Sequence, residues 1–109
     1  MRKLGVMLVA FDLPTSTKEQ KSKSAAFRRN LIKNGYLMLQ ESVYIKLFRL
    51  CSGSSGEIRK LENLAPDDGN IMAFPLTLES FRSAVPIRGV LLDIEQFSDD
   101  LVVIDPKAS

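Results

Sequence analysis

The 109-residue sequence contains no histidine and only one cysteine, and these absences exclude several kinds of site. A Ser–His or Cys–His nucleophile system needs an imidazole, and an ordinary structural zinc site needs four Cys or His ligands, so both are excluded. Cys51 has no second cysteine with which to form a disulfide inside the chain. Any catalysis must therefore use carboxylates, hydroxyls, amines or a metal ion.

Long apolar segments are also missing from the sequence. It has no run of 18 apolar residues and no signal-peptide pattern, so we expect a cytoplasmic protein that does not associate with membranes. A composition of 45% hydrophobic and 26% charged residues is typical of a globular chain of about one domain. A chain of this length buries only about two-thirds of its unfolded surface, so an oligomeric interface would add stability.

Charge is distributed unevenly along the chain, although the formal net charge is only +2. Residues 1–60 carry 12 Lys and Arg against 4 Asp and Glu, whereas residues 61–109 carry 3 against 9. The basic part is consistent with a solvated surface or with a surface that binds a polyphosphate. The acidic part is likewise consistent with a solvated surface or with the docking of a partner.

Apolar periodicity predicts alternating strands and helices. A nearly continuous apolar run predicts a buried strand over 4–11, and Ser16 or Thr17 caps a basic amphipathic helix that begins near Lys18 and ends at Asn34-Gly35. Ser54, three residues before Glu57, marks the approach to a second helix. The remaining predicted elements are two strands with a tight bend over 36–48, a short amphipathic helix that contains Ile58, Leu61 and Leu64, a turn over 66–69, a strand over 70–75, a helical turn or short helix within 76–83, and strands over 85–92 and 101–104.

The order strand, helix, two strands, helix, strand predicts an α+β fold of the ferredoxin-like βαββαβ type. We expect residues 1–84 to form this core. Residues 85–109 would then supply additional C-terminal strands that complete a dimer or contact a partner. Helices cover one face of such a sheet, and packing against a second copy would hide the other, so we predict a homodimer through sheet packing.

Asp12 ends the first predicted strand between Phe11 and Leu13, where a buried carboxylate without a partner would cost several kcal/mol. Two explanations remain open. In the first, Asp12 accepts backbone hydrogen bonds in the turn that opens the helix. In the second, a twofold axis brings two Asp12 carboxylates together, and magnesium or another divalent cation neutralises them, with phosphate oxygens and water completing its shell.

The first predicted helix is strongly basic. Six basic residues against one acidic residue over sixteen positions favour contact with a nucleic-acid backbone, although a solvated helix face is the alternative. No aromatic stacking pattern of an RNA-recognition domain accompanies them, so base-specific recognition is not expected. The candidate nucleic-acid-binding residues are Lys18, Lys21, Lys23, Arg28, Arg29 and Lys33.

Three motifs together carry a family resemblance: F-D-L-P at 11–14, N-G-Y at 34–36 and L-Q-E-S-V-Y at 39–44. With this spacing the chain resembles the Cas-two family of small CRISPR-associated adaptation proteins, often labelled endoribonucleases. The later segments G-N-I-M-A-F-P-L-T and L-V-V-I are most similar to members from type II loci, which encode a large single-protein RNA-guided nuclease.

The resemblance implies a ferredoxin-like homodimer in which the paired Asp12 residues bind magnesium and act in metal-dependent phosphodiester cleavage. It also implies a scaffold that carries duplex protospacer DNA, with RNA as the alternative nucleic acid, between two dimers of the CRISPR integrase subunit. Phe11 stands where tyrosine is frequent, and Met38 stands where arginine often occurs. Methionine cannot supply a cation to the developing phosphate charge, so the scaffold role is expected to dominate.

A second class of function remains open. Ferredoxin-like dimers also serve as small-molecule-binding regulatory domains, in which an aspartate near a strand end contacts a ligand amine. Stabilisation by a metabolite would favour that class, whereas stabilisation by duplex DNA would favour the nucleic-acid class.

Overall fold

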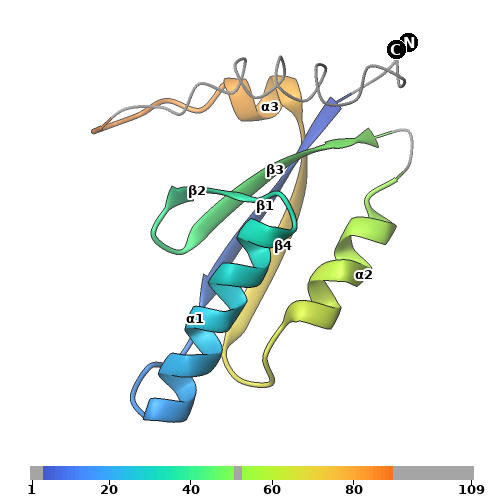
Figure 1. The fold of residues 1–109 in the computed structure, drawn as a ribbon. Helices are drawn as coiled ribbons and strands as arrows, with labels where there is room; N and C mark the ends of the chain where they lie inside the picture. The colour runs from blue at the N-terminus through green and yellow to red at the C-terminus, as the bar shows by residue number, and fades with distance from the viewer. Residues whose placement is uncertain (1–3, 51–52, 90–109) are drawn as a thin grey trace.

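A computed structural model describes residues 4–50 and 53–89 of the chain. Seven elements follow one another, and Figure 1 shows them coloured along the chain. They are β1 (Leu4–Asp12), α1 (Lys18–Lys33), β2 (Leu37–Gln40), β3 (Val43–Arg49), α2 (Ser55–Leu64), β4 (Asn70–Thr77) and α3 (Leu78–Arg82). No helix in these two ranges is both long enough and apolar enough to cross a membrane.

The four strands form one antiparallel sheet in the order β2-β3-β1-β4. This is the ferredoxin-like arrangement, so the predicted α+β fold class is confirmed. β1 takes a central place because its apolar run can be buried on both faces, and its residues Val6, Met7 and Val9 have no exposed surface. The predicted bend between β2 and β3 is a two-residue turn at Glu41 and Ser42.

The start of α1 is fixed by a capping box. The Thr17 hydroxyl accepts a hydrogen bond from the Gln20 amide at 3.1 Å, and the Gln20 side chain accepts one from the Thr17 amide at 3.1 Å. Of the two capping residues that the sequence offered, Thr17 is therefore the N-cap. The helix ends at Lys33 with Asn34 as its C-cap, and Gly35 follows with a φ of 92°, a conformation that glycine adopts without strain.

The two faces of the sheet are covered unequally. α1 and α2 lie together over one face (Figure 1), where Met7, Val9 and Phe11 of β1 enter the main core. Alternate β1 residues point to the opposite face, where Val6 packs with Ile45 and with Phe81 of α3. We call this opposite face the second sheet face; on the three longer strands it includes Val6, Leu8, Ala10, Val43, Ile45, Leu47, Met72, Phe74 and Leu76.

The second sheet face is only partly covered by the described residues. α3 packs over its Val6 end, but Met72, which pairs with Ala10, is 59% exposed, and Phe74, which pairs with Leu8, is 39% exposed. Large apolar side chains gathered on one face are typical of a surface that packs against something else. The face therefore has the character that the prediction of sheet packing requires.

The helical segment predicted within 76–83 is confirmed as α3, but the strand before it is longer than predicted. β4 continues through Pro75 to Thr77, and α3 then begins at Leu78 under a Thr77 cap. An edge strand tolerates Pro75 because one of its sides carries no ladder hydrogen bonds. Residues 85–89, the described part of the strand predicted over 85–92, are not in a strand; Pro86 has no backbone N–H to donate to a ladder. Residues 90–92 and the strand predicted over 101–104 lie outside the described residues.

Candidate nucleic-acid interface and metal site

Asp12 is the last residue of β1 and pairs with Asn70 of β4. Because Phe11 faces the helices, the side chain of Asp12 lies on the second sheet face. The expectation that Asp12 is buried is wrong: it is exposed, since the described elements leave this end of the face uncovered. Within residues 4–50 and 53–89 its carboxylate has no hydrogen-bond or ion-pair partner, so solvent satisfies its charge.

The carboxylate of Asp12 does not form a metal site with its neighbours in one chain. No group of three Asp, Glu or Cys side chains in the described part of the chain could hold an ion. The donor chemistry nevertheless fits a hard cation, because Asp12 offers two exposed oxygen atoms that no described residue engages. The described residues of one chain therefore offer a metal ion at this position a single carboxylate.

The turn that leads into β4 closes tightly against the end of β1. Gly69 has a φ of 89°, and a Cβ atom placed on it would lie 2.8 Å from the Asp12 carbonyl oxygen and 2.7 Å from Leu13 Cδ2. Only glycine combines this backbone conformation with so close an approach. Gly69 thus lets the turn before β4 pack closely against the chain where it leaves β1, at Asp12 and Leu13.

We expect Gly69→Ala to destabilise the fold by about 1–3 kcal/mol, because the new methyl group meets backbone and the positive φ is strained. Urea unfolding measures this loss. Gly56→Ala is the matched control, because a Cβ atom placed on Gly56 would have no neighbour within 4 Å and the residue sits in the first turn of α2. Equal stability of the Gly69→Ala variant and the wild type would contradict this role.

Three of the predicted basic residues form a ridge on the outer side of α1. Lys18, Arg29 and Lys33 are separated by eleven and four residues, a spacing that places them on one helix face, opposite the buried residues Phe27 and Leu31. All three are exposed and have no ion-pair partner among the described residues. We call these three residues the basic ridge. Lys21 is also exposed, on the flank of the same helix.

Arg28 is placed differently from the basic ridge. Its side chain is half-buried, its Nη1 donates a hydrogen bond to the Glu41 carbonyl oxygen, and its guanidinium lies 5.1 Å from the centre of the Phe11 ring. A cation over an aromatic face is held electrostatically as well as by packing. The charge of Arg28 is therefore engaged inside the protein.

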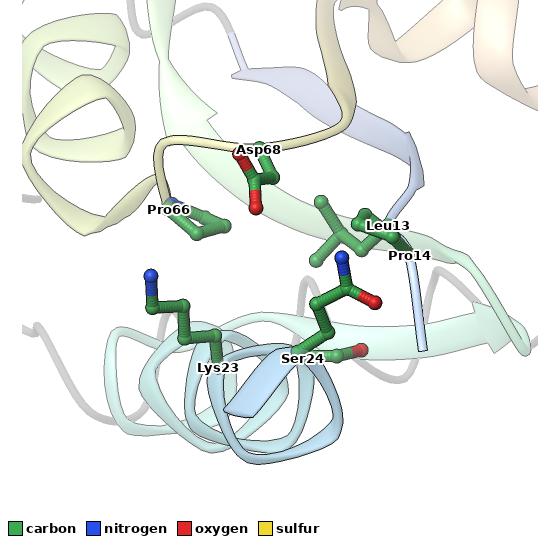
Figure 2. Close-up of a pocket in the computed structure, with 7 residues that line it drawn as sticks. Leu13, Pro14, Lys23, Ser24, Pro66 and Asp68 are labelled. Atoms are coloured by element: carbon green, nitrogen blue, oxygen red, sulfur yellow. The ribbon is translucent and has the colours of Figure 1, made fainter. Parts of the chain in front are cut away.

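Lys23 lies in acidic surroundings. It forms an ion pair with Glu19 at 3.2 Å, and the hydrogen bond and charge of Glu19, with smaller contributions from Asp68 and Asp67, raise its pKa above the ordinary 10.5. Figure 2 shows Lys23 and Asp68 on opposite sides of a shallow hollow. The hollow is lined by Leu13, Pro14, Gln20, Lys23, Ser24, Pro66 and Asp68. Among the exposed lysines of α1, Lys23 is thus the least suited to attract a phosphate.

Helix α2 contributes two features that the sequence reasoning missed. Arg59 and Lys60 are exposed on α2, which lies on the same sheet face as α1 (Figure 1). Their position beside the basic helix depends on how α2 packs, which the sequence does not show. Their positive charge was the only local feature that could have marked them as candidate nucleic-acid-binding residues. They extend the basic character of the helical layer.

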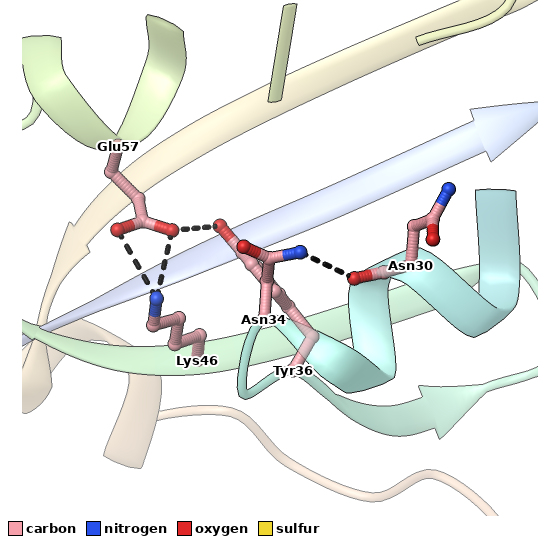
Figure 3. Close-up of polar contacts among 5 residues, drawn as sticks. All are labelled: Asn30, Asn34, Tyr36, Lys46 and Glu57. Carbon is pink, nitrogen blue, oxygen red and sulfur yellow. Dashed lines mark hydrogen bonds and ion pairs between the residues drawn. The ribbon is translucent and has the colours of Figure 1, made fainter. Parts of the chain in front are cut away.

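Glu57 is the second feature of α2. Its carboxylate accepts hydrogen bonds from the Tyr36 hydroxyl at 2.9 Å and from Lys46 Nζ at 3.1 and 3.3 Å (Figure 3). Ser54 makes no side-chain cap bond, so Glu57 serves this cluster instead of a capping box. Burial, and then the bond to Glu57, raise the pKa of Tyr36 above its ordinary 10.0, so the phenol stays a proton donor and ties α2 to the sheet.

Met38 does not lie on the strand that carries Asp12. It is exposed on β2, and β3 lies between β2 and β1. A single chain therefore does not place residue 38 beside Asp12 on a neighbouring strand. The methionine that stands where the family often has arginine therefore lies on an exposed edge strand of the sheet.

The fold and the site together define a class: a small ferredoxin-like α+β domain with an exposed carboxylate at the end of its first strand, an apolar face beside it and a basic helix on the other side of the sheet. The family model described as CRISPR associated protein Cas2 matches residues 6–84. The chain belongs to this family, as its motifs indicated.

Curated relatives agree with this assignment. The chain is 32% identical over 94 residues to a protein of Campylobacter jejuni, a match that covers 86% of this chain and 66% of that protein. It is 34% identical over 83 residues to a protein of Streptococcus mutans, covering 76% and 78%, and 27% identical over 99 residues to one of Lacticaseibacillus rhamnosus, covering 90% and 98%. Each of the three is named CRISPR-associated endoribonuclease Cas2.

Proposed function

We propose that two copies of the chain associate through the second sheet face and serve as a DNA-binding scaffold in CRISPR spacer acquisition, bridging integrase subunits. The observation that carries this proposal is the apolar second sheet face, which ends at an exposed Asp12 and lies opposite the basic ridge. Family membership and the names of the relatives support the CRISPR role.

Association through the second sheet face follows from its apolar side chains. Met72 and Phe74 lose contact with water if a second copy packs over them. A twofold interface uses the same patch on both copies, so it brings each residue near the axis close to its own counterpart. Asp12 lies on this face, and we propose that the pair of Asp12 carboxylates forms a shared acidic site.

The shared acidic site would hold magnesium or another divalent cation through the Asp12 oxygens of both copies. Two like charges in one site repel each other, and a divalent cation removes that repulsion. When bound, the ion supplies Lewis-acid stabilisation of phosphate charge, the chemistry of metal-dependent phosphodiester cleavage. The relatives' name, endoribonuclease, supports RNA as one substrate of this activity.

DNA binding is assigned to the helical layer. Lys18, Arg29 and Lys33 are exposed and have no ion-pair partner within the described ranges, and two copies would present two such ridges. Exposed Lys and Arg side chains bind phosphates by releasing condensed counterions, without reading the base sequence. A scaffold that must accept many different protospacers requires this kind of contact.

The competing proposal, a small-molecule regulatory domain, finds less support. Ligand pockets usually enclose about 300–1,000 Å³. The hollow beside Lys23 is open to solvent and has a cavity volume of only about 10 Å³. A thermal shift with duplex DNA, and none with a panel of metabolites, would separate the two classes.

The association is tested with Met72→Asp. A charge at this position has to be buried without a partner when two second sheet faces meet, so we expect the dissociation constant of the dimer to rise by about 10–100-fold. Analytical ultracentrifugation measures this constant. Ile32→Asp is the matched control, because Ile32 on α1 is 58% exposed against 59% for Met72 and lies on the helical side.

A Met72→Asp variant that remains as strongly dimeric as the Ile32→Asp variant would contradict association through this face. A monomeric wild type would also contradict it. In that case the face would be covered from within the chain or by another protein.

A further inference from the structure

Phe11, the residue before Asp12, is enclosed by side chains from two elements. Its ring lies 5.1 Å from the Phe27 ring in an edge-to-face arrangement and 5.7 Å from the Tyr44 ring. Arg28, the next residue along α1 after Phe27, places its guanidinium 5.1 Å from the same Phe11 ring. The last residue before the candidate site is therefore held by contacts with α1 and β3.

The backbone of Phe11 is tied to the turn that Arg28 also holds. The Phe11 amide donates to the Ser42 carbonyl oxygen at 3.0 Å, and Ser42 follows Glu41, whose carbonyl oxygen accepts the hydrogen bond from Arg28. The Arg28 guanidinium thus contacts the Phe11 ring directly. It also binds the β2–β3 turn, whose Ser42 carbonyl oxygen accepts the hydrogen bond from the Phe11 amide. These contacts connect α1 to the end of β1, both directly and through the β2–β3 turn.

We propose that Arg28 is a positioning residue that fixes the end of β1, and with it the direction of Asp12, rather than a direct contact to nucleic acid. The link to Asp12 rests on the proposed function. Asp12 follows Phe11 directly and points to the opposite face, so the orientation of the Phe11 peptide sets where the Asp12 carboxylate lies. A metal site formed by two carboxylates tolerates little error in that direction.

Arginine suits this role better than lysine. Its planar guanidinium stacks over a ring while its N–H groups donate in the plane to a carbonyl oxygen. A lysine ammonium is a compact, strongly hydrated charge that does not stack in this way. The role therefore depends on the shape of the side chain as well as on its charge.

The direct test is amide hydrogen exchange at Phe11, measured by NMR in Arg28→Met and Arg28→Lys. Loss of the contacts to the turn and the ring should accelerate exchange of the Phe11 amide by about tenfold in both variants. The amide of Val9, in the middle of β1, should keep its wild-type rate. Arg29→Met is the matched control, because Arg29 is adjacent and exposed and should leave both rates unchanged.

Two functional readouts separate positioning from phosphate contact. In Arg28→Lys, the magnesium concentration that half-saturates the thermal shift should rise about tenfold, while the salt dependence of DNA binding stays as in the wild type. Arg29→Met should do the reverse, with a weaker salt dependence and an unchanged magnesium midpoint. Three results would each overturn the proposal. The first is a wild-type exchange rate of the Phe11 amide in both Arg28 variants, and the second is an unchanged magnesium midpoint in Arg28→Lys. The third is a salt dependence of DNA binding that weakens in Arg28→Met as it does in Arg29→Met.

The failure of the proposed function gives a different pattern. If neither the wild type nor Asp12→Asn responds to magnesium, the shared metal site is wrong. Exchange at Phe11 still decides in that case whether Arg28 fixes the end of β1.

Discussion

Replacing Asp12 with asparagine is expected to reduce metal-dependent phosphodiester cleavage by about 10²–10³-fold while the fold and the dimer persist. Asparagine keeps the shape of the side chain but removes the negative charge that would hold the cation. Because Asp12 is exposed and has no partner among the described residues, its replacement leaves no buried group unsatisfied. Cleavage of RNA and DNA oligonucleotides over a range of magnesium concentrations measures the effect.

The same variant separates binding of the metal from its consequences. Magnesium should raise the melting temperature of the wild type and leave that of Asp12→Asn unchanged, since a ligand stabilises only the folded state that binds it. In a spacer-acquisition assay, a protein that acts only as a scaffold should tolerate Asp12→Asn, whereas a required nuclease should not. Wild-type cleavage by the variant would dismiss Asp12 as the site.

The second large effect concerns the basic ridge. The triple variant Lys18→Gln, Arg29→Gln, Lys33→Gln removes three positive charges per chain and six per dimer, so the slope of log K against log salt should become shallower by about 5 units. At ~50 mM salt the affinity for duplex DNA should fall by about 10³-fold. Fluorescence anisotropy with a labelled duplex from ~50 to ~200 mM salt gives both quantities.

Lys23→Gln is the matched control for the basic ridge. It removes one charge from the same helix, but Lys23 is paired with Glu19 and faces Asp68, so the slope should change little. Binding by the triple variant with the wild-type slope would show that the DNA lies elsewhere. Binding by the wild type that does not depend on salt would reject backbone contact altogether.

The part of the fold that sequence could predict is the part set by local chemistry. The apolar run of β1, the capping box at Thr17 and the Asn34-Gly35 end of α1 each act within a few residues, and each appears in the structure. Pro75 shows the limit of local rules. Whether a proline ends a strand depends on whether that strand lies at the edge of the sheet, which only the strand order decides.

The environment of Asp12 could not be predicted, because it depends on what covers the sheet. The apolar neighbours Phe11 and Leu13 suggested burial, yet alternation along β1 turns Asp12 to the face that α3 covers only at its far end. The identity of the candidate residue came from its position at the end of the strand and from the family motif. Its exposure came from the three-dimensional arrangement.

Partners far apart in sequence were also beyond prediction. Glu57 contacts Tyr36, 21 residues earlier, and Arg28 contacts the carbonyl of Glu41, 13 residues later. The sequence does not show whether a charged residue on a helix contacts solvent or a carbonyl oxygen. The six basic residues of α1 therefore read as one set, whereas the structure divides them into a ridge, a flank and two engaged side chains.

The central claim is that two chains pair so that their Asp12 residues meet. The most direct measurement is the spin–spin distance in a Cys51→Ser, Asp12→Cys protein carrying a nitroxide at position 12, with Ser22→Cys on the outer side of α1 as the reference. We predict labels at position 12 close enough to broaden the continuous-wave spectrum, and labels at position 22 far apart. A dimer with position 12 farther apart than position 22, or the absence of any dipolar interaction, would contradict it.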